Sequence, residues 1–213
     1  MTKIDASDAW LPAELGQFLR GRLPAGLSAI GNQNLLAGKK LGLFCSRQCP
    51  GELILKSYDL MQNLRDAGVT VISGFHAPMD KECLRILLRG KQPIIVCPAR
   101  SIEGMRLKQE FREPVEQGRM LVLSPFPAKK RRITAERAEE RNRFVAALAD
   151  AVLFIHAAPG SKTEQLCREL LSARRPVFVI PSQYNDDLVK LDAATVPANL
   201  EDMFVESRRQ PHA

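Results

Sequence analysis

Short apolar runs alternate with amphipathic segments from Lys40 to Pro181. The runs are five or six residues long and rich in Val, Ile, Leu and Phe, which is typical of strands buried on both faces of a sheet. They predict six strands, at residues 40–45, 69–73, 93–97, 119–124, 151–156 and 176–180. Apolar residues at helical spacing predict helices between them, at residues 53–66, 81–89, 108–117, 134–149 and 161–173. This order predicts a Rossmann-like, three-layer α/β fold with a mainly parallel six-stranded sheet.

The two ends of the chain do not follow this alternation. Residues 1–38 hold two short amphipathic pieces, 11–21 and 25–36, which we expect to pack against the core as a helical extension. Residues 39–182 then form the Rossmann-like domain. We expect residues 183–213 to form a tail that is partly packed and frayed over its last eight residues.

The charge of the chain indicates a polyanionic partner. Its 213 residues include 31 Lys and Arg against 24 Asp and Glu, which gives a net charge of +7. Nucleic acid or a nucleotide is the first candidate for such a partner. No apolar run approaches the roughly 18 residues that cross a bilayer, and the first residues lack the apolar segment of a signal peptide. We therefore expect a cytoplasmic protein without membrane contact.

The five cysteines do not indicate a disulfide framework. They are odd in number, and most lie in apolar or helical patterns, where a reduced thiol behaves as a small hydrophobic group. Cys45 and Cys49 are spaced C-x3-C, without a second Cys or His pair at zinc-finger spacing. The sequence therefore predicts no metal, and nothing in it calls for a cofactor.

Candidate binding residues follow the first two predicted strands. In an open parallel sheet, ligands collect at the carboxyl ends of the strands, where loops lead into helix N-termini that offer N–H groups to anions. The turn CSRQCPG supplies a hydroxyl and a guanidinium in Ser46 and Arg47. The turn SGFHAPMD supplies Gly74 for close backbone approach and Asp80 as a helix N-cap. His76, in the same turn, is either a general base or a solvated residue.

The segment after the fourth strand, SPFPAKKRRITAERAEERNRFV, is the most basic part of the chain. Its loop cations either contact a phosphate backbone or are a solvated surface. After the fifth strand, Gly160 makes a tight turn, Ser161 or Thr163 can cap the next helix, and Lys162 is available to a phosphate. Neither a Walker A loop nor a G-x-G-x-x-G turn is present, which argues against an ATPase and a nicotinamide dehydrogenase.

Taken in order, the motifs CSR, SGFHAPMD, SPF, RNRFVAALAD, PGSKTE and RRPVFVIPS make residues 40–182 resemble the DprA/Smf family of DNA-processing proteins. In that family, four turns converge on a pocket that binds phosphates of single-stranded DNA. The resemblance implies phosphate contacts from Ser46, Arg47, Ser73, Gly74, Asp80, Arg141, Asn142, Arg143, Gly160, Ser161 and Thr163. The charge pattern adds Lys130, Arg131 and Lys162 to this set. Cys45 stands where the family has glycine, and Phe75 and His76 occupy the glycine-rich part of the second turn.

The resemblance implies a protein that binds single-stranded DNA and assists recombination or DNA uptake. It also implies a RecA-type recombinase as a partner, and the apolar tail residues Leu188, Val189 and Leu191, expected to be exposed, suggest a homodimer interface. Two alternatives are a phosphoribohydrolase of the related LOG type and a nucleotide-sensing module without turnover. The LOG motif P-G-G-x-G-T-x-x-E places its acid three residues after threonine, whereas Glu164 directly follows Thr163 here. We therefore expect no catalytic residue.

Overall fold

All six predicted strands are present in the computed structural model, which describes residues 2–4 and 26–205. They run parallel in the spatial order β6-β5-β4-β3-β7-β8. Every residue in them is buried, because helices cover both faces of this sheet. Their bounds are β3 (Lys40–Cys45), β4 (Thr70–Ser73), β5 (Ile94–Val96), β6 (Met120–Ser124), β7 (Ala151–His156) and β8 (Val177–Val179).

The sheet is wider than the six strands predicted. Two further strands, β1 (Thr2–Ile4) and β2 (Leu27–Gly31), extend it antiparallel beyond β6. At the other edge, β9 (Ala194–Thr195) pairs parallel with β8. Within the described residues the sheet therefore has nine strands, and both of its edges come from outside the predicted alternation.

The helix predicted at residues 25–36 is wrong. This segment forms strand β2 and the short 3-10 helix η1 (Gln33–Leu36). Pairing with β6 gives the β2 backbone its hydrogen-bond partners, and the strand ends at Gly31. A Cβ on Gly31, whose φ is +109°, would lie 2.2 Å from the Met120 oxygen. The other predicted helical piece, 11–21, and the tail end predicted to be frayed lie outside the described residues.

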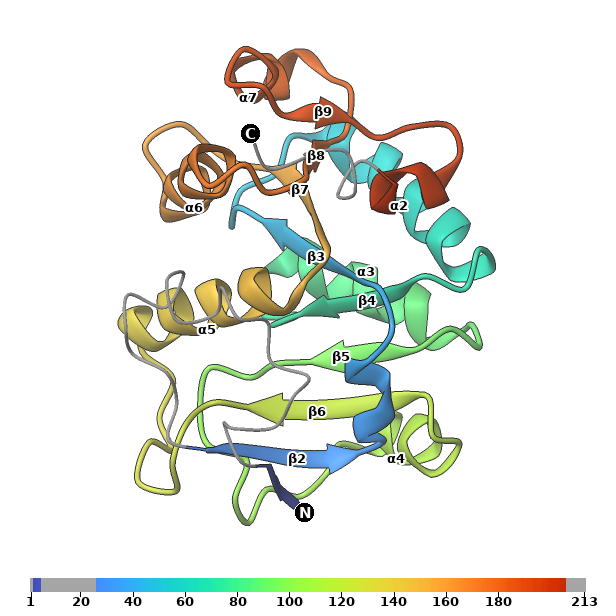
Figure 1. The fold of residues 1–213 in the computed structure, drawn as a ribbon, viewed down its shortest axis with the longest axis vertical. Coiled ribbons are helices and arrows are strands. Elements are labelled where there is room, and N and C mark those ends of the chain that lie inside the picture. Colours follow the sequence, from blue (N-terminus) through green and yellow to red (C-terminus); the bar gives the residue numbers. More distant parts are fainter. Residues whose placement is uncertain (1, 5–25, 206–213) are drawn as a thin grey trace, which may run out of the picture.

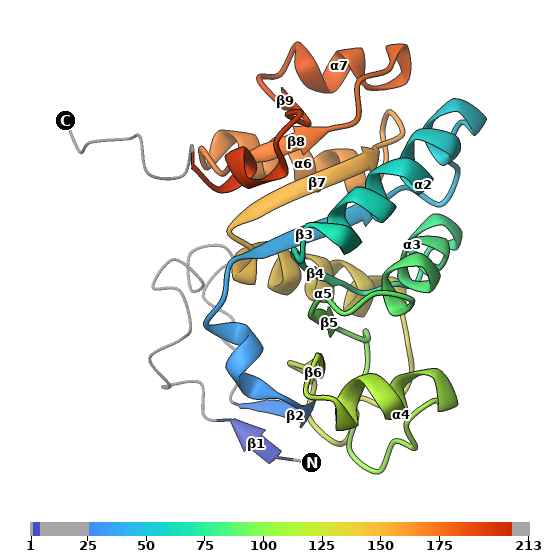
Figure 2. The ribbon, with the colours of Figure 1, turned by 90° about the vertical axis from the view of Figure 1, so that its right-hand side faces the viewer.

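The helices form two layers, one on each face of the sheet (Figure 2). One layer packs Leu53, Cys83 and Phe111 against alternate strand residues, and the other packs Val145 and Leu170 against the opposite face. The first layer contains α2 (Gly51–Asp66), α3 (Pro78–Leu88) and α4 (Gln109–Glu116), and the second contains α5 (Ala135–Leu148) and α6 (Lys162–Ser172). No helix in the described ranges is both long and apolar enough to span a bilayer.

The tail after β8 is folded onto the core as far as residue 205. It contains η2 (Gln183–Asn185), α7 (Asp186–Val189) and η3 (Leu200–Phe204). The expectation that Leu188 is exposed is wrong, because α7 turns this side chain into the same core as α6 and leaves it 2% exposed. Of the three apolar tail residues, Val189 is exposed and Leu191 is partly exposed.

The carboxyl ends of the parallel strands meet at one edge of the sheet. In Figure 1 the arrowheads of β3, β5 and β6 all point toward that edge, at the left. The loops that follow β3, β4, β5, β6 and β7 therefore lie side by side there, although they are far apart in the sequence.

Candidate functional site

The first pair of candidate loops meets through two serines. Ser46, after β3, and Ser161, the N-cap of α6, have their hydroxyl oxygens 3.3 Å apart. The Ser46 hydroxyl also accepts a hydrogen bond from the backbone N–H of Ala158 at 2.9 Å. Ser161 accepts one from the N–H of Glu164 at 3.1 Å. The turn after β3 is thus fastened to the N-terminus of α6, with Ser46 buried between them.

A second pair of loops meets where Arg141 of α5 lies against Gly74, after β4. The Arg141 side chain is buried and donates to the Cys97 carbonyl at 2.9 Å and to the Asn142 side-chain oxygen at 2.8 Å. A Cβ on Gly74 would lie 1.4 Å from Arg141 Nη1, so only glycine leaves room for the guanidinium. Ser73, just before, donates to the Leu43 carbonyl at 2.8 Å and fixes this turn to β3.

Asp80 lies in the same region, at the start of α3. The helix begins at Pro78, earlier than predicted, because proline is favoured in the first turn. Asp80 is therefore not the N-cap but the third residue of the helix, and one carboxylate oxygen accepts from the Ala77 N–H at 3.3 Å. Its other oxygen is buried without a hydrogen-bond partner. Burial raises the pKa of Asp80 to about 7, against the opposing effect of the Arg141 charge.

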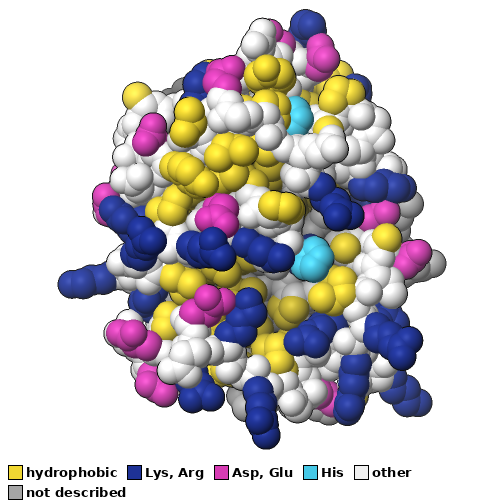
Figure 3. Space-filling view, turned by 180° about the vertical axis from the view of Figure 1, so that it is seen from behind, with side chains coloured by type: hydrophobic (Ala, Val, Ile, Leu, Met, Phe, Trp, Pro, Cys, Tyr) yellow, Lys and Arg dark blue, Asp and Glu magenta, His cyan; other side chains and the backbone are white. Residues whose placement is uncertain are grey.

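Exposed cations surround this buried centre. Partial burial first, and then the positive charges of Arg141, Lys81 and Arg47, hold the pKa of the exposed His76 below its ordinary value. Arg47 and Lys81 are exposed. On the face covered by α2, α3 and α4, Lys and Arg side chains gather around apolar patches (Figure 3). The turn after β4 leads into α3, on this cation-bearing face.

Two of the predicted cations, Arg143 and Lys162, are held in ion pairs between α5 and α6. Arg143 makes two hydrogen bonds to the Glu169 carboxylate of α6, at 2.5 and 2.9 Å. Lys162 is exposed and lies 3.6 Å from Glu139 of α5. These contacts tie α5 to α6, so the two side chains are less available to a phosphate than Arg47. Thr163 follows Lys162 in the first turn of α6.

Lys130 and Arg131 lie in the loop after β6. The Lys130 ammonium is 3.7 Å from Glu140 and 5.6 Å from the centre of the Phe126 ring. Arg131 helps to line a hollow of about 340 Å³ together with Arg100 and Arg106. Arg100 and Arg106 are not among the predicted site residues, although both follow a predicted strand at its carboxyl end, where ligands of parallel sheets collect.

The turn after β7 is hydrogen-bonded to Glu164, the acid that a LOG-type hydrolase would need. Gly160 has φ +72° and donates its N–H to Glu164 at 2.7 Å. Arg168 donates to the same carboxylate at 2.7 Å. Arg168 first, and then the Gly160 N–H, hold the pKa of Glu164 below its ordinary value. An ionised, fully engaged carboxylate is a poor general acid for a glycosidic bond.

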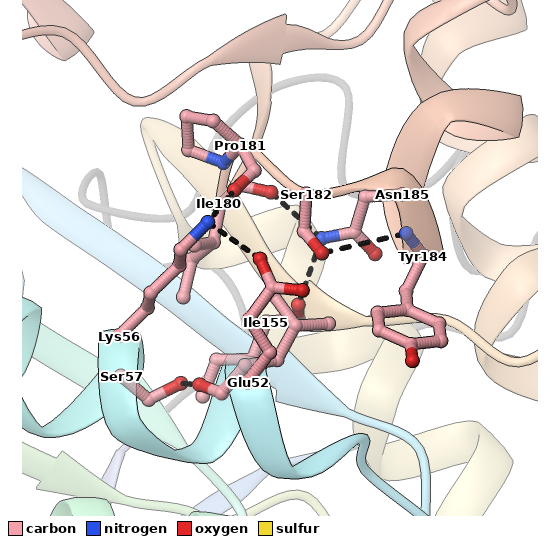
Figure 4. Close-up of polar contacts among 10 residues, drawn as sticks. Glu52, Lys56, Ser57, Ile155, Ile180, Pro181, Ser182, Tyr184 and Asn185 are labelled. Atoms are coloured by element: carbon pink, nitrogen blue, oxygen red, sulfur yellow. Dashed lines mark hydrogen bonds and ion pairs between the residues drawn. The ribbon is translucent and has the colours of Figure 1, made fainter.

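A polar network that the sequence analysis missed closes the far end of the same edge (Figure 4). Lys56 of α2 donates to Glu52 and to the Pro181 carbonyl, both at 2.7 Å. Asn185 donates to the carbonyls of Ile155 and Ile180, at 3.0 and 2.9 Å. The Lys56 bond to Pro181 ties α2 to the loop after β8, and Asn185 ties that loop to the ends of β7 and β8. The i,i+4 spacing of Glu52 and Lys56 was the sequence signal for part of this network.

The turn after β3 also contains a thiol that differs from the others. A hydrogen bond from Cys45 lowers the pKa of the partly exposed Cys49 thiol. Burial raises the pKa of Cys97 and of Cys167 to about 12. Because the thiolate is the nucleophile, we expect iodoacetamide near neutral pH to modify Cys49 first. Peptide mapping after timed exposure measures this order, and faster labelling of Cys167 would contradict it.

The fold and these contacts define the protein as a Rossmann-like α/β protein with its polar groups gathered at the carboxyl edge of the sheet. The chain belongs to the family of DNA recombination-mediator protein A, whose sequence model matches residues 4–205. No curated protein matches it by sequence.

Solved structures support this assignment of the fold. DNA processing protein A (DprA) from Streptococcus pneumoniae superposes with a TM-score of 0.76 at 20% identity, over 96% of this chain and 74% of that one. DNA processing protein A from Helicobacter pylori, described with its single-stranded DNA binding mode, superposes with a TM-score of 0.68 at 21% identity, over 89% of both chains. A molybdenum cofactor binding protein from Rippkaea orientalis is more distant, with a TM-score of 0.52 at 12% identity over 79% of this chain and 93% of that one.

Proposed function

We propose that this protein binds single-stranded DNA through its phosphates at the carboxyl edge of the sheet. The observation that carries the proposal is the buried guanidinium of Arg141 against Gly74, with the exposed cations Arg47 and Lys81 on the segments that follow β3 and β4. The description of the Helicobacter pylori protein as a single-stranded DNA binder agrees with it.

The proposed site divides into an inner and an outer part. Arg141 is 4% exposed and hydrogen-bonded, so it organises the turn and sets the positive potential. Arg47, Lys81 and Arg131 lie outside the buried Arg141 and contact the phosphates, whereas Lys130 is 3.7 Å from Glu140 and is less available. Such contacts position a strand without reading its bases, so we expect binding with little sequence preference.

Salt dependence tests the proposal. Each phosphate contact releases a counterion, so the affinity for a labelled oligothymidylate falls steeply as salt rises. Arg47→Ala is expected to weaken binding and to reduce the slope of log K against log salt by about 0.7–1. Fluorescence anisotropy at several salt concentrations measures both quantities.

The control for this test is Arg89→Ala, which removes an equal charge from the opposite edge of the sheet. Arg89 is exposed and follows α3, whose C-terminus leads to the start of β5. Its replacement should leave affinity and slope unchanged. Undetectable binding by the unaltered protein at low salt would refute the proposed function, and an equal loss in both variants would refute the site.

The biological part of the proposal follows from family membership. We infer a role in recombination or DNA uptake in the cytoplasm, as a homodimer that hands DNA to a RecA-type recombinase, with residues 39–182 carrying the site. The exposed Val189 and the partly exposed Leu191 remain as apolar tail contacts for a dimer. A monomeric mass by light scattering at working concentrations would contradict the homodimer.

A further inference from the structure

A hollow opens between α2 and α3, directly beside the turns that carry Arg47 and His76. Its volume is about 420 Å³, which is within the range of small-molecule sites. Cys49, Ile54, Tyr58, Pro78 and Met79 form its less polar part. The two cations Arg47 and Lys81 and the acid Glu82 complete the lining.

The two cations of this hollow belong to the segments after β3 and β4, where we propose that phosphates bind. Arg47 and Lys81 both line it, so the hollow and the proposed phosphate contacts share two residues. Glu82 is occupied by Arg85, which donates to it at 2.7 Å. A strand whose phosphates contact Arg47 and Lys81 therefore has its sugars and bases next to the hollow.

The lining suits a flat, weakly polar group. Tyr58 is partly exposed and presents an aromatic ring, and Ile54 is also partly exposed, whereas Met79 is buried beneath. Base–aromatic stacking is the usual way in which proteins hold single-stranded nucleic acid without reading its sequence. A cation at the rim adds attraction for the phosphate on either side of the stacked base.

We propose that the hollow between α2 and α3 receives a nucleobase of the bound strand, which stacks on Tyr58 while Arg47 and Lys81 hold the adjoining phosphates. This inference rests on the proposed function and adds to it a base-binding subsite that is distinct from the phosphate contacts.

The test separates bases from phosphates. The unaltered protein is titrated with a labelled oligothymidylate and with an abasic strand of equal length, which keeps every phosphate and lacks every base. We expect oligothymidylate to bind about tenfold or more tightly, because one stacked base contributes that much. Equal affinity for the two strands, with a normal salt slope, would overturn the base subsite and leave the proposed function intact. No binding of either strand would overturn the proposed function itself.

Variants of the tyrosine locate the effect. Tyr58→Ala is expected to lose the advantage of oligothymidylate over the abasic strand without a change in salt slope, because no charge is removed. Tyr58→Phe keeps the ring and should bind as the unaltered protein does. Tyr184→Ala is the matched control, since Tyr184 is 48% exposed and lies outside the hollow, in η2. A Tyr58→Ala protein that keeps the full advantage, or a Tyr184→Ala protein that loses it, would place the base elsewhere.

Discussion

Replacing Gly74 with alanine is expected to weaken oligothymidylate binding by roughly tenfold or more and to lower the free energy of unfolding by about 1–3 kcal/mol. The new methyl group would lie 1.4 Å from Arg141 Nη1 and 1.9 Å from its Cζ. The guanidinium must then leave its place, and its hydrogen bond to the Cys97 carbonyl is lost. The φ of Gly74 is not positive, so the effect comes from space and not from backbone strain.

The matched control is Gly51→Ala, in the turn after β3. A Cβ at Gly51, the first residue of α2, meets nothing within 4 Å. We expect this variant to bind as the unaltered protein does and to be equally stable or more stable by about 0.4–1 kcal/mol, because alanine restricts the unfolded chain. Urea unfolding and fluorescence anisotropy measure both proteins. If Gly74→Ala matched Gly51→Ala in both assays, the contact between Arg141 and Gly74 would not organise the site.

Asp80→Asn is expected to remove a large pH dependence of stability. The pKa of Asp80 in the folded protein is about 7, because the carboxyl group is buried, whereas an unfolded chain has a value of about 3.9. Between these values the folded protein binds the proton more tightly than the unfolded one, so stability falls as pH rises from about 4 to about 7. Over that window the loss amounts to about 4 kcal/mol.

The asparagine variant has no proton to lose at this position. Its stability relative to the unaltered protein should therefore rise by about 4 kcal/mol between pH 4 and pH 8. The charged and titratable groups near Asp80 are Arg141, Cys45, Cys49 and Cys83, and they are the same in both proteins. A pH-independent difference for Asp80→Asn would contradict the raised pKa.

The sequence predicted the core of the fold because strands buried on both faces consist of unbroken apolar runs. It did not predict β2, whose residues change from buried to exposed along its length and whose only neighbours in the sheet, β1 and β6, lie elsewhere in the chain. The start of α3 was placed too late because the apolar spacing begins after Pro78, whereas proline itself marks the first turn.

The site was predictable where it depends on local turns and not where it depends on partners from distant helices. The sequence indicated that Gly74 allows close approach, but it could not show that Arg141 is the group that approaches. It counted Arg143 as a phosphate contact, whereas Glu169 of α6 engages that guanidinium in the folded chain. Nothing in the sequence indicated that Tyr58 binds a ligand, because the hollow forms only where α2 and α3 pack side by side.

The pairing of β2 with β6 has a consequence for synthesis on the ribosome. Ser28 lies opposite Ser124, so β2 emerges well before its partner β6, and β3, β4 and β5 are synthesised between them. At about 5–20 residues per second this delay lasts several seconds. The units β3-α2-β4 and β5-α4-β6 have close neighbours and can form first, since short loops close at lower entropic cost. Strand β2 can pair only after β6 has emerged, and a nascent chain stalled before residue 120 lacks this pairing.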